Sequence, residues 1–339
     1  MRSFEFWPPR VFEAPYYLYL VLKCARRMLP IKYLAKANYA LDHGELGLGS
    51  KYTTQMAFAQ NRFLPTALLQ GYQTPSALEQ TIDTFVQAHG YPVVLKPDIG
   101  ALGKGVMKIR SKADAERVRG VIQVPFLLQA FSPFTYEYGV FFTRKKGVNR
   151  ITGINKKHFP SIVGNGHETI AQLAASHYRF TDHWRIFLKY IDTERIPDEG
   201  EQVQLSFIGS HTMGCKFTDD THLVTPALKA SLFSVCDSQP GFNFGRLDVK
   251  AESEEAFREG QFVVIEVNGV ASLPTHMFDP ANTLRRAYQI FLNHGSDLVD
   301  IANEHRNQPM NLSSYSEIWR LATSNAVLLN DIHDAAMSS

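Results

Sequence analysis

Two late segments of the chain carry the side chains best suited to chemistry. In FGRLDVK, Arg246 and Asp248 are two residues apart, and in VVIEVNG the same spacing separates Glu266 from Asn268. Side chains alternate along a strand, so each pair shares one face of a sheet. If the two strands pair, an arginine and three oxygen ligands converge on one patch. Carboxylates and an amide carbonyl are the hard oxygen donors that Mg²⁺ prefers.

The apolar neighbours of these side chains favour a functional site over an ordinary solvent face. The alternative is a half-exposed sheet, whose outer face often carries polar residues in alternation. Here the acidic residues are embedded in strongly apolar strands, and Ile265 and Val267 are expected to face the core, opposite Glu266. A solvent face would usually add Thr, Lys or Ser residues. The pattern therefore predicts a metal site.

A glycine-rich stretch, YPVVLKPDIGALGKGVMKI, has the features of a phosphate cradle. It is neither a Walker loop, which needs GxxxxGK[ST] before a helix, nor a dinucleotide fingerprint, which needs GxGxxG between a strand and a helix. Its glycines, Gly100, Gly103 and Gly105, are instead expected between two strands. Glycines let backbone N–H groups approach a phosphate closely, and Lys96 and Lys104 supply positive charge. A flexible turn is the alternative.

Composition bounds the remaining function classes. The 339 residues suffice for one large domain or two to three small ones. Lys plus Arg number 35 against 33 Asp plus Glu, so the net charge of +2 gives no reason to expect a nucleic-acid partner. Three widely spaced cysteines fit neither a disulfide framework nor a zinc pattern. We read them as reduced thiols of a cytoplasmic protein.

The N-terminus predicts neither a signal peptide nor a transmembrane segment. It lacks an apolar stretch that ends in a small-residue cleavage site. The run PYYLYLVLKCARRMLP, residues 15–30, is apolar and then basic, and it is shorter than the roughly 20 residues of a membrane span. We expect a helix packed on the body of the protein. The alternative is a helix on a membrane surface, with Arg26 and Arg27 near the headgroups.

The order of elements predicts an α+β fold. The first 50 residues read as mostly helical, and strands and helices then alternate, with several strands joined by hairpins. EQVQLSFIG is expected to be a strand, residues 169–191 a helix, and AESEEAFREG a solvated acidic connection between the two late strands.

Several motifs in order resemble the ATP-grasp superfamily. They are Lys96-Pro97 before the glycine loop, LLQAF followed by Glu137, GRLDV and EVNG. IVGNGHETIAQL also resembles the VxGDGxxTIxEL element of cyanophycin-synthetase-like ligases, and D-Ala–D-Ala ligases are relatives of the same kind. The resemblance spans about Gly49 to Asp279. It implies two α+β subdomains that grip ATP, preceded by a short helical region in place of a full Rossmann-like domain. The segments implied are 1–70, 71–131, 132–310 and 311–339.

The resemblance also implies roles for individual residues. Arg246 would stabilise charge on the phosphoryl group, and the cation beside that group would be Lys156 or Lys157, between which the sequence does not choose. Two Mg²⁺ ions would be held by Asp248, Glu266 and Asn268. The residues implied at ATP are Lys51, Lys96, Gly100, Gly103, Lys104, Gly105, Gln129, Ala130, Phe131 and Glu137. Of these, the resemblance implies residues 129–131 beside adenine and Glu137 at the ribose hydroxyls.

The activity implied is an ATP-dependent ligation of a small-molecule carboxylate to an amine through an acyl phosphate. The acceptor pocket departs from that of D-Ala–D-Ala ligases, because GVASLPTH follows Asn268 in place of a Pro-Gly turn. Pocket candidates are His211, Ser272, Thr275 and His276. Two alternatives remain open: a kinase that phosphorylates a hydroxyl, and a nucleotide-binding module without chemistry. A homodimer is also left open.

Overall fold

The structure is a computed structural model that describes residues 4–46, 49–71, 74–100, 103–118, 122, 124–180, 191–211, 214–321 and 323–324. The chain divides into two compact units. The smaller comprises Lys157–Phe217, and the larger contains the remaining residues. The division into four segments that the resemblance implies stays a prediction.

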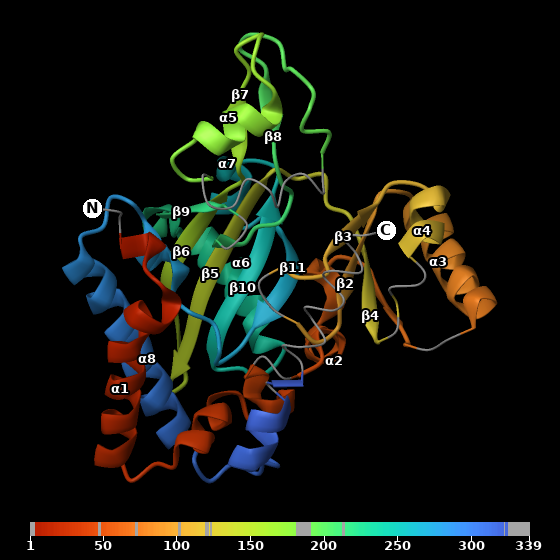
Figure 1. Ribbon diagram of the computed structural model, residues 1–339. Coiled ribbons are helices and arrows are strands. Elements are labelled where there is room, and N and C mark those ends of the chain that lie inside the picture. The colour runs from red at the N-terminus through yellow and green to blue at the C-terminus, as the bar shows by residue number, and fades with distance from the viewer. Residues whose placement is uncertain are drawn as a thin grey trace. The chain divides into compact units, whose positions relative to one another are not determined.

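A five-stranded sheet forms the centre of the larger unit, in the order β11-β10-β5-β6-β9 (Figure 1). Strands β6 and β9 continue along the chain into the smaller unit. The hairpin of β5 and β6 turns at Lys146-Gly147. The five strands are β5 (Tyr136–Lys145), β6 (Val148–His158), β9 (Lys216–Asp219), β10 (Phe244–Ala251) and β11 (Val263–Asn268).

One face of this sheet is covered by apolar packing. Tyr138, Leu247 and Val249 are fully buried there, together with side chains of α6 (Pro226–Asp237) and α7 (Glu254–Arg258). The connection between β10 and β11, which we expected to be acidic and solvated, contains the short helix α7, whose Phe257 is buried. Ser253 caps that helix by accepting from Ala256 N, and Phe257 stacks on the Tyr138 ring at 3.9 Å between centroids.

A second, four-stranded sheet of the larger unit has the order β1-β4-β2-β3. Two helices, α3 (Pro75–His89) and α4 (Lys112–Val118), contribute to its apolar core. The glycine loop joins the antiparallel strands β2 and β3, as predicted. Strand β1 was not predicted, because its four residues are too few to show a period. The four strands are β1 (Thr66–Leu69), β2 (Val93–Pro97), β3 (Met107–Ile109) and β4 (Phe126–Ala130).

The N-terminal region is helical, as predicted, and packs against the long helix α8 (Leu284–Glu304). The Tyr16 ring of α1 stacks on Phe291 of α8 at 3.9 Å between centroids. No helix in the described part of the chain is long and apolar enough to cross a membrane. The short helices of this region are η1 (Phe4–Phe6), η2 (Ile31–Asn38), η3 (Asp42–Glu45), α2 (Lys51–Met56) and η4 (Gln60–Arg62), and α1 spans Pro9–Arg26.

The smaller unit is built on a two-stranded sheet of β7 (Ser161–Val163) and β8 (Gln202–Gln204). The predicted strand EQVQLSFIG is therefore too long, because pairing ends at Gln204. The predicted helix 169–191 begins as α5 (Ile170–Ser176), with a capping box of Thr169 and Gln172. That helix ends at Ser176, and residues 181–190 lie outside the described residues.

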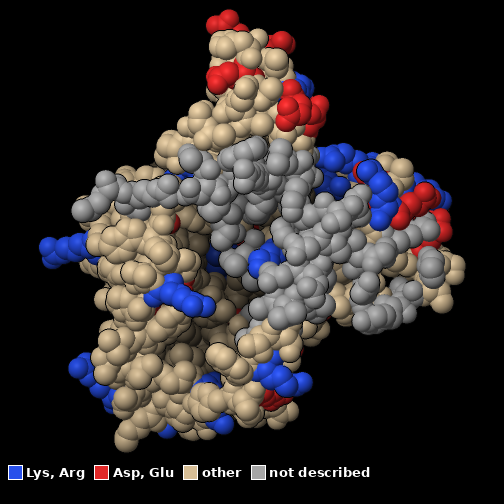
Figure 2. Space-filling model, in the orientation of Figure 1, with Lys and Arg blue, Asp and Glu red and all other residues tan. Residues whose placement is uncertain are grey.

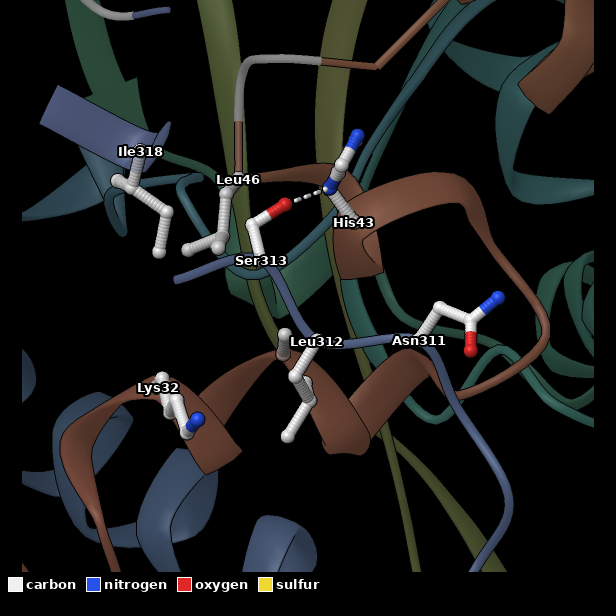
Figure 3. Close-up of a pocket in the computed structure, with 8 residues that line it drawn as sticks. Lys32, His43, Leu46, Asn311, Leu312, Ser313 and Ile318 are labelled. Atoms are coloured by element: carbon white, nitrogen blue, oxygen red, sulfur yellow. Dashed lines mark hydrogen bonds between the residues drawn. The ribbon is translucent and has the colours of Figure 1, made fainter. Parts of the chain in front are cut away.

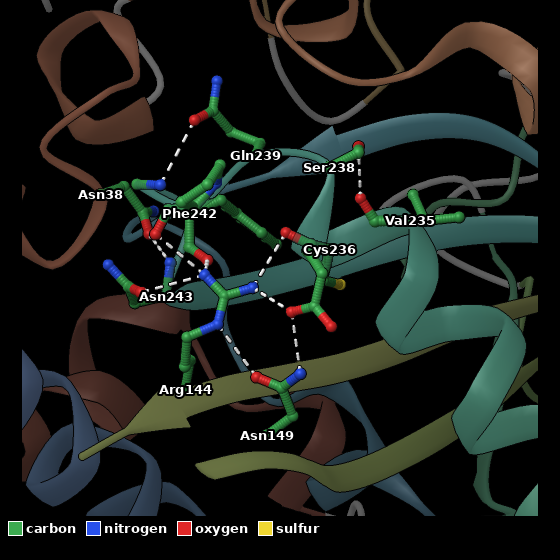
Figure 4. A network of polar contacts seen from close by, with 12 residues as sticks. Asn38, Arg144, Asn149, Val235, Cys236, Ser238, Gln239, Phe242 and Asn243 are labelled. Carbon is green, nitrogen blue, oxygen red and sulfur yellow. Dashed lines mark hydrogen bonds and ion pairs between the residues drawn. The ribbon is translucent and has the colours of Figure 1, made fainter. Parts of the chain in front are cut away.

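Arg144 fixes the chain that leads into β10 (Figure 4). Its guanidinium donates to the carbonyls of Cys236, Pro240 and Phe242, to the Asn149 side chain at 2.9 Å and to Asp237 at 2.6 Å. The Arg144 side chain is only 13% exposed. It thereby joins the β5–β6 hairpin, the end of α6 and the start of β10.

The Arg144 network predicts a large effect of Arg144→Met. Methionine keeps the apolar stem but leaves buried carbonyls without a donor, so the free energy of unfolding should fall by about 2–4 kcal/mol. Urea denaturation measures the change. Arg150→Met on the same hairpin, where the side chain is exposed, is the matched control and should change stability by less than about 0.5 kcal/mol. Equal effects of the two substitutions would contradict this account.

Candidate functional site

The predicted pairing of the two late strands is present, and it places four polar side chains on one face. In antiparallel register, Arg246 lies opposite Asn268, and Asp248 lies opposite Glu266. The apolar core covers the other face, where Leu247 lies opposite Val267. The register therefore places these four residues on one patch.

Arg246 and Asp248 form a two-point ion pair. The guanidinium Nε and Nη2 donate to the two carboxylate oxygens at 2.7 and 3.0 Å, and the Asn268 amide donates to the same carboxylate at 3.4 Å. Burial opposes the charge on Arg246, but the attraction of Asp248, and then of Glu266 and Glu137, outweighs it and raises the pKa of the guanidinium. The face therefore keeps an arginine cation among carboxylates.

A β-bulge next to Asp248 gives this site a further hydrogen-bond acceptor. Asp248 pairs with Glu266, but the next residue of β10 pairs with Val264, so Ile265 has no partner in the ladder. The Ile265 carbonyl instead accepts from Lys96 Nζ at 3.0 Å. Our expectation that Ile265 faces the core was wrong, because the bulge makes Val264 the buried residue. Bulges often re-aim a strand beside an active site in this way.

Lys96, on strand β2 of the four-stranded sheet, lies at the same site. Its Nζ also contacts the Gln129 Oε1 at 3.1 Å, and Gln129 in turn donates to the Ile265 carbonyl at 3.3 Å. Burial lowers the pKa of Lys96, and the nearby carboxylate of Glu266 opposes that shift. Gln129, which we expected beside adenine, therefore positions the predicted phosphate lysine with its side chain.

Lys51 contacts the glycine loop and lies near Glu266, one of the predicted metal ligands. It begins α2, where Ser50 caps the helix by accepting from Thr53 N at 3.0 Å. Lys51 Nζ donates to the carbonyl of Gly100 and lies 3.9 Å from the Glu266 carboxylate. Ser50 is thus a helix cap that fixes the start of the helix bearing Lys51.

The glycine loop has the backbone that its glycines predict. Gly103 and Gly105 have φ of 75° and 69°, a left-handed conformation that residues with a Cβ rarely adopt. Lys104 lies between them, partly exposed, and residues 101 and 102 lie outside the described residues. Figure 2 shows a hollow in the middle of the view, with basic side chains at its edge.

The expected adenine and ribose residues lie next to two lysines that sequence reasoning missed. Lys250 lies 3.6 Å from the Glu137 carboxylate, and Lys108 Nζ lies 3.7 Å from the centre of the Phe131 ring. Lys250 could have been found, because it follows Asp248 by two residues and so shares its face. Ala130 N donates to the Pro65 carbonyl at 2.9 Å, so that donor is used within the protein.

The two candidate lysines of β6 differ in orientation. Lys156 pairs with Glu254 at 2.9 Å, and its Nζ lies over the ring of Tyr138, which belongs to the apolar face of the sheet. Lys156 therefore points away from Asp248. Lys157, the next residue, is buried and has the opposite orientation by alternation along the strand.

The loop after Asn268 holds three of the predicted pocket residues. The Ser272 hydroxyl donates to the Gly269 carbonyl at 2.7 Å, and the Ser272 carbonyl contacts His294 Nε2 at 2.8 Å. Thr275 donates to the Asn155 Oδ1 at 2.9 Å. Ser272 thus shapes the loop, while Thr275 reaches the central sheet. The fourth candidate, His211, lies in the smaller unit against Phe217.

Two buried polar atoms next to this loop have no hydrogen-bond partner among the described residues. They are Nδ2 of Asn155 and Nδ1 of His276. Gly139 makes room for Asn155: a Cβ at Gly139 would lie 2.3 Å from Asn155 Oδ1 and 2.9 Å from Cδ of Arg246. Buried polar atoms are usually satisfied, so these two are candidates for contact with a bound molecule. Sequence reasoning missed Asn155.

The N-terminal region supports the same loop. Val270 N and Ala271 N each lie 3.3 Å from a carbonyl of Gly44 or Glu45. Burial raises the pKa of Glu45 to about 7, against a hydrogen bond from Thr54 and the charge of Lys51. The helical residues of the N-terminal region therefore pack directly behind the predicted metal asparagine.

A small pocket elsewhere in the larger unit is not lined by any predicted site residue (Figure 3). It lies between η2, η3 and the residues after α8. Ser313 and His43 Nδ1 contact each other at 2.9 Å at its edge.

The chain resembles several solved structures, although no protein-family model and no curated protein matches it. D-alanine–D-alanine ligase from Bacillus anthracis is 12% identical, with a TM-score of 0.45 over 78% of this chain and 68% of that one. The bifunctional glutathione synthetase from Pasteurella multocida is 13% identical, with a TM-score of 0.39 over 78% and 37%. N5-carboxyaminoimidazole ribonucleotide synthetase is 14% identical, with a TM-score of 0.41 over 74% and 51%.

These three proteins are ATP-grasp ligases, the family that the sequence motifs resemble. The chain spans about a third to two thirds of their lengths. The predicted α+β class is confirmed by two sheets whose strands do not follow the chain order, together with the helices that accompany them.

The crowding at Gly139 predicts that Gly139→Ala disables the site. The new methyl group must displace Asn155 and Arg246, and a shift of about 1 Å at an active site can cost on the order of a hundredfold in rate. ATP turnover measures the loss. Tyr138→Phe, next to it on the apolar face, is the control: it removes a buried hydroxyl that has no hydrogen-bond partner in the described part of the chain, and it should leave turnover unchanged. Full activity of Gly139→Ala would refute this geometry.

Two buried histidines behind the loop predict a loss of stability in acid. Burial lowers the pKa of His276 to about 4 and that of His294 to about 3. Below the ordinary pKa of about 6.5 the unfolded chain takes up protons that the folded chain does not, so stability falls as pH falls. At about pH 5 each histidine accounts for about 2 kcal/mol.

Replacement of His294 by glutamine tests this directly. A glutamine amide can still donate to the Ser272 carbonyl but does not titrate. The loss in unfolding free energy between about pH 7 and pH 5 should shrink by about 2 kcal/mol in His294→Gln. An unchanged pH dependence in urea denaturation would show that His294 protonates in the folded state.

Proposed function

We propose that this protein is an ATP-dependent ligase that joins a carboxylate to an amine through an acyl phosphate. The observation that carries the proposal is the opposed pairing of Asp248 with Glu266 and of Arg246 with Asn268 on one sheet face. Lys96 and Lys51 lie at the same face from separate elements. Cations from three elements beside paired carboxylates suit a triphosphate and its metal.

The donor set fits Mg²⁺. Among the described residues, no group of three or more His, Cys, Asp or Glu side chains could hold a metal ion. Mg²⁺ does not need such a group, because it is usually held by one or two carboxylates together with substrate phosphates and water. Asp248, Glu266 and Asn268 would hold it. When bound, the ion neutralises charge on the phosphate oxygens.

The cations of the chain would position the nucleotide. Lys96 is fixed by Gln129 and the Ile265 carbonyl, so its ammonium group is held ready for a phosphate oxygen. Lys51 lies against the glycine loop at Gly100, where backbone N–H groups can approach the phosphates. Glu137, buried beside Lys250, would accept from the ribose hydroxyls. Preorganised positive charge is the main catalytic device in phosphoryl transfer.

The reaction would proceed in two balanced steps. A carboxylate oxygen of the substrate attacks the γ-phosphorus of ATP, the bond to the β-phosphate oxygen breaks, and ADP leaves. The amine then attacks the acyl carbon, inorganic phosphate leaves with the C–O bond electrons, and the amine loses a proton. Arg246 would stabilise the developing negative charge, and Lys157 is the β6 lysine proposed for the phosphoryl group.

Hydroxylamine trapping tests the reaction class. With Mg²⁺, ATP and pooled amino acids, hydroxy acids and short peptides, we expect ATP-dependent hydroxamate and ADP. Hydroxylamine replaces the unknown amine, so only the carboxylate must be present in the pool. ADP with a stable phosphorylated product and no hydroxamate would instead establish a kinase.

Matched variants tie that activity to the site. Asp248→Ala and Glu266→Ala should each lower Mg²⁺-dependent turnover by at least about a hundredfold, since each removes a proposed ligand. Lys156→Ala should stay near wild-type rate, because Lys156 pairs with Glu254 on the other face. Lys157→Ala should lose turnover. Normal activity of Asp248→Ala or Glu266→Ala would overturn the metal assignment.

A further inference from the structure

The outer face of α1 is apolar and exposed. The inner face, with Phe12, Tyr16, Leu20 and Cys24, is buried against α8. The side chains on the opposite side recur at helical spacing and are half exposed or more: Val11 at 58%, Tyr17 at 51%, Leu18 at 61%, Val21 at 51% and Leu22 at 53%. This set, with Met28 beyond the helix end, is called the α1 outer face below. A helix on the surface of a water-soluble protein normally carries polar residues on its outer side.

One more apolar side chain is exposed at the end of α1, on a residue with a left-handed backbone conformation. Met28 has φ of 48°, and the Leu29 N–H donates back to the Cys24 carbonyl at 2.9 Å to close the helix. Glycine is the usual residue at such a left-handed position. A methionine that is 82% exposed stands here instead. Helix closure alone does not explain this choice, because glycine would close the helix with less strain.

The charges around the α1 outer face have one predominant sign. Residues 7–32 contain five Lys and Arg against a single acid, Glu13, for a net charge of +4. The whole chain has +2, so the other residues together carry −2. Arg10 and Arg26 are exposed, and Arg27 and Lys23 share Asp300 at 3.0 and 3.1 Å. An apolar face with a basic rim is complementary to an anionic surface with an apolar interior.

We propose that the α1 outer face binds the surface of an anionic lipid bilayer. The helix would lie parallel to the surface, with Leu18 and Val21 at the boundary between headgroups and acyl chains and Arg10 and Arg26 near lipid phosphates. Such a helix lies on the membrane and does not cross it. A second copy of the chain is a poorer occupant, because a twofold contact would bring together two copies of segment 7–32, each with a net charge of +4 and with Arg10 and Arg26 exposed.

Vesicle flotation of the full chain tests the proposal. We expect flotation with vesicles of phosphatidylcholine and phosphatidylserine, much less with phosphatidylcholine alone, and a decrease as salt is raised. The double variant Leu18→Asp, Val21→Asp should lower the partition coefficient by at least about tenfold, because it places carboxylates in the lipid boundary. Its thermal unfolding should match wild type, since both side chains are exposed.

Matched controls separate this face from general stickiness and charge. Ile196→Asp, at a residue 50% exposed in the smaller unit, and Arg258→Glu, at an exposed basic residue outside α1, should bind vesicles like wild type. Met28→Gly should unfold at a higher temperature and yet bind vesicles more weakly. A purely structural role of Met28 would give lower stability with unchanged binding.

Two results would overturn the proposal. One is the absence of flotation with anionic vesicles. The other is binding that the Leu18→Asp, Val21→Asp variant retains. A dimer in light scattering that Leu18→Asp dissociates, without vesicle binding, would assign the face to a second copy instead.

Discussion

The candidate site depends on the register between β10 and β11. Because Asp248 lies opposite Glu266 and Arg246 opposite Asn268, period-two alternation places all four on the face away from the apolar core. A slip of β11 by one residue would turn Glu266 and Asn268 toward the apolar core, away from Asp248. The bulge at Ile265 follows from the same pairing and supplies the carbonyl that holds Lys96. The start of β10 is in turn fixed by the buried Arg144 network.

The N-terminal region supports the candidate site, a role that its composition does not predict. Asn38 is fully buried, and its side chain bonds the backbone of Asn243 and Phe244 at the start of β10 and the Gly44 carbonyl. A Cβ at Gly269 would lie 2.2 Å from Cβ of Glu45, so this region meets the loop after Asn268 at close range. A short helical segment thereby supports both strands of the site.

The parts predicted from sequence are those set by local pattern. Alternation in two apolar strands predicted the shared face of Arg246 and Asp248, and three glycines between strands predicted the loop. The bulge at Ile265 could not be predicted, because it depends on pairing between residues 15 to 18 positions apart in the chain. The orientation of Lys156 required knowledge of its partner, Glu254, and the role of Asn155 required the neighbouring Gly139. Contacts between distant segments leave no periodic signal in one sequence.

The measurement that tests the central claim most directly is electron paramagnetic resonance of Mn²⁺ with ADP. Mn²⁺ accepts the same oxygen ligands as Mg²⁺, and its resonance spectrum changes when the ion is immobilised by binding. The account predicts that the wild-type protein immobilises Mn²⁺ when ADP is present, that Asp248→Asn and Glu266→Gln each abolish this, and that Tyr138→Phe on the other face does not. Equal Mn²⁺ binding by the wild type and both carboxylate variants would contradict the claim that this face holds the metal and its nucleotide.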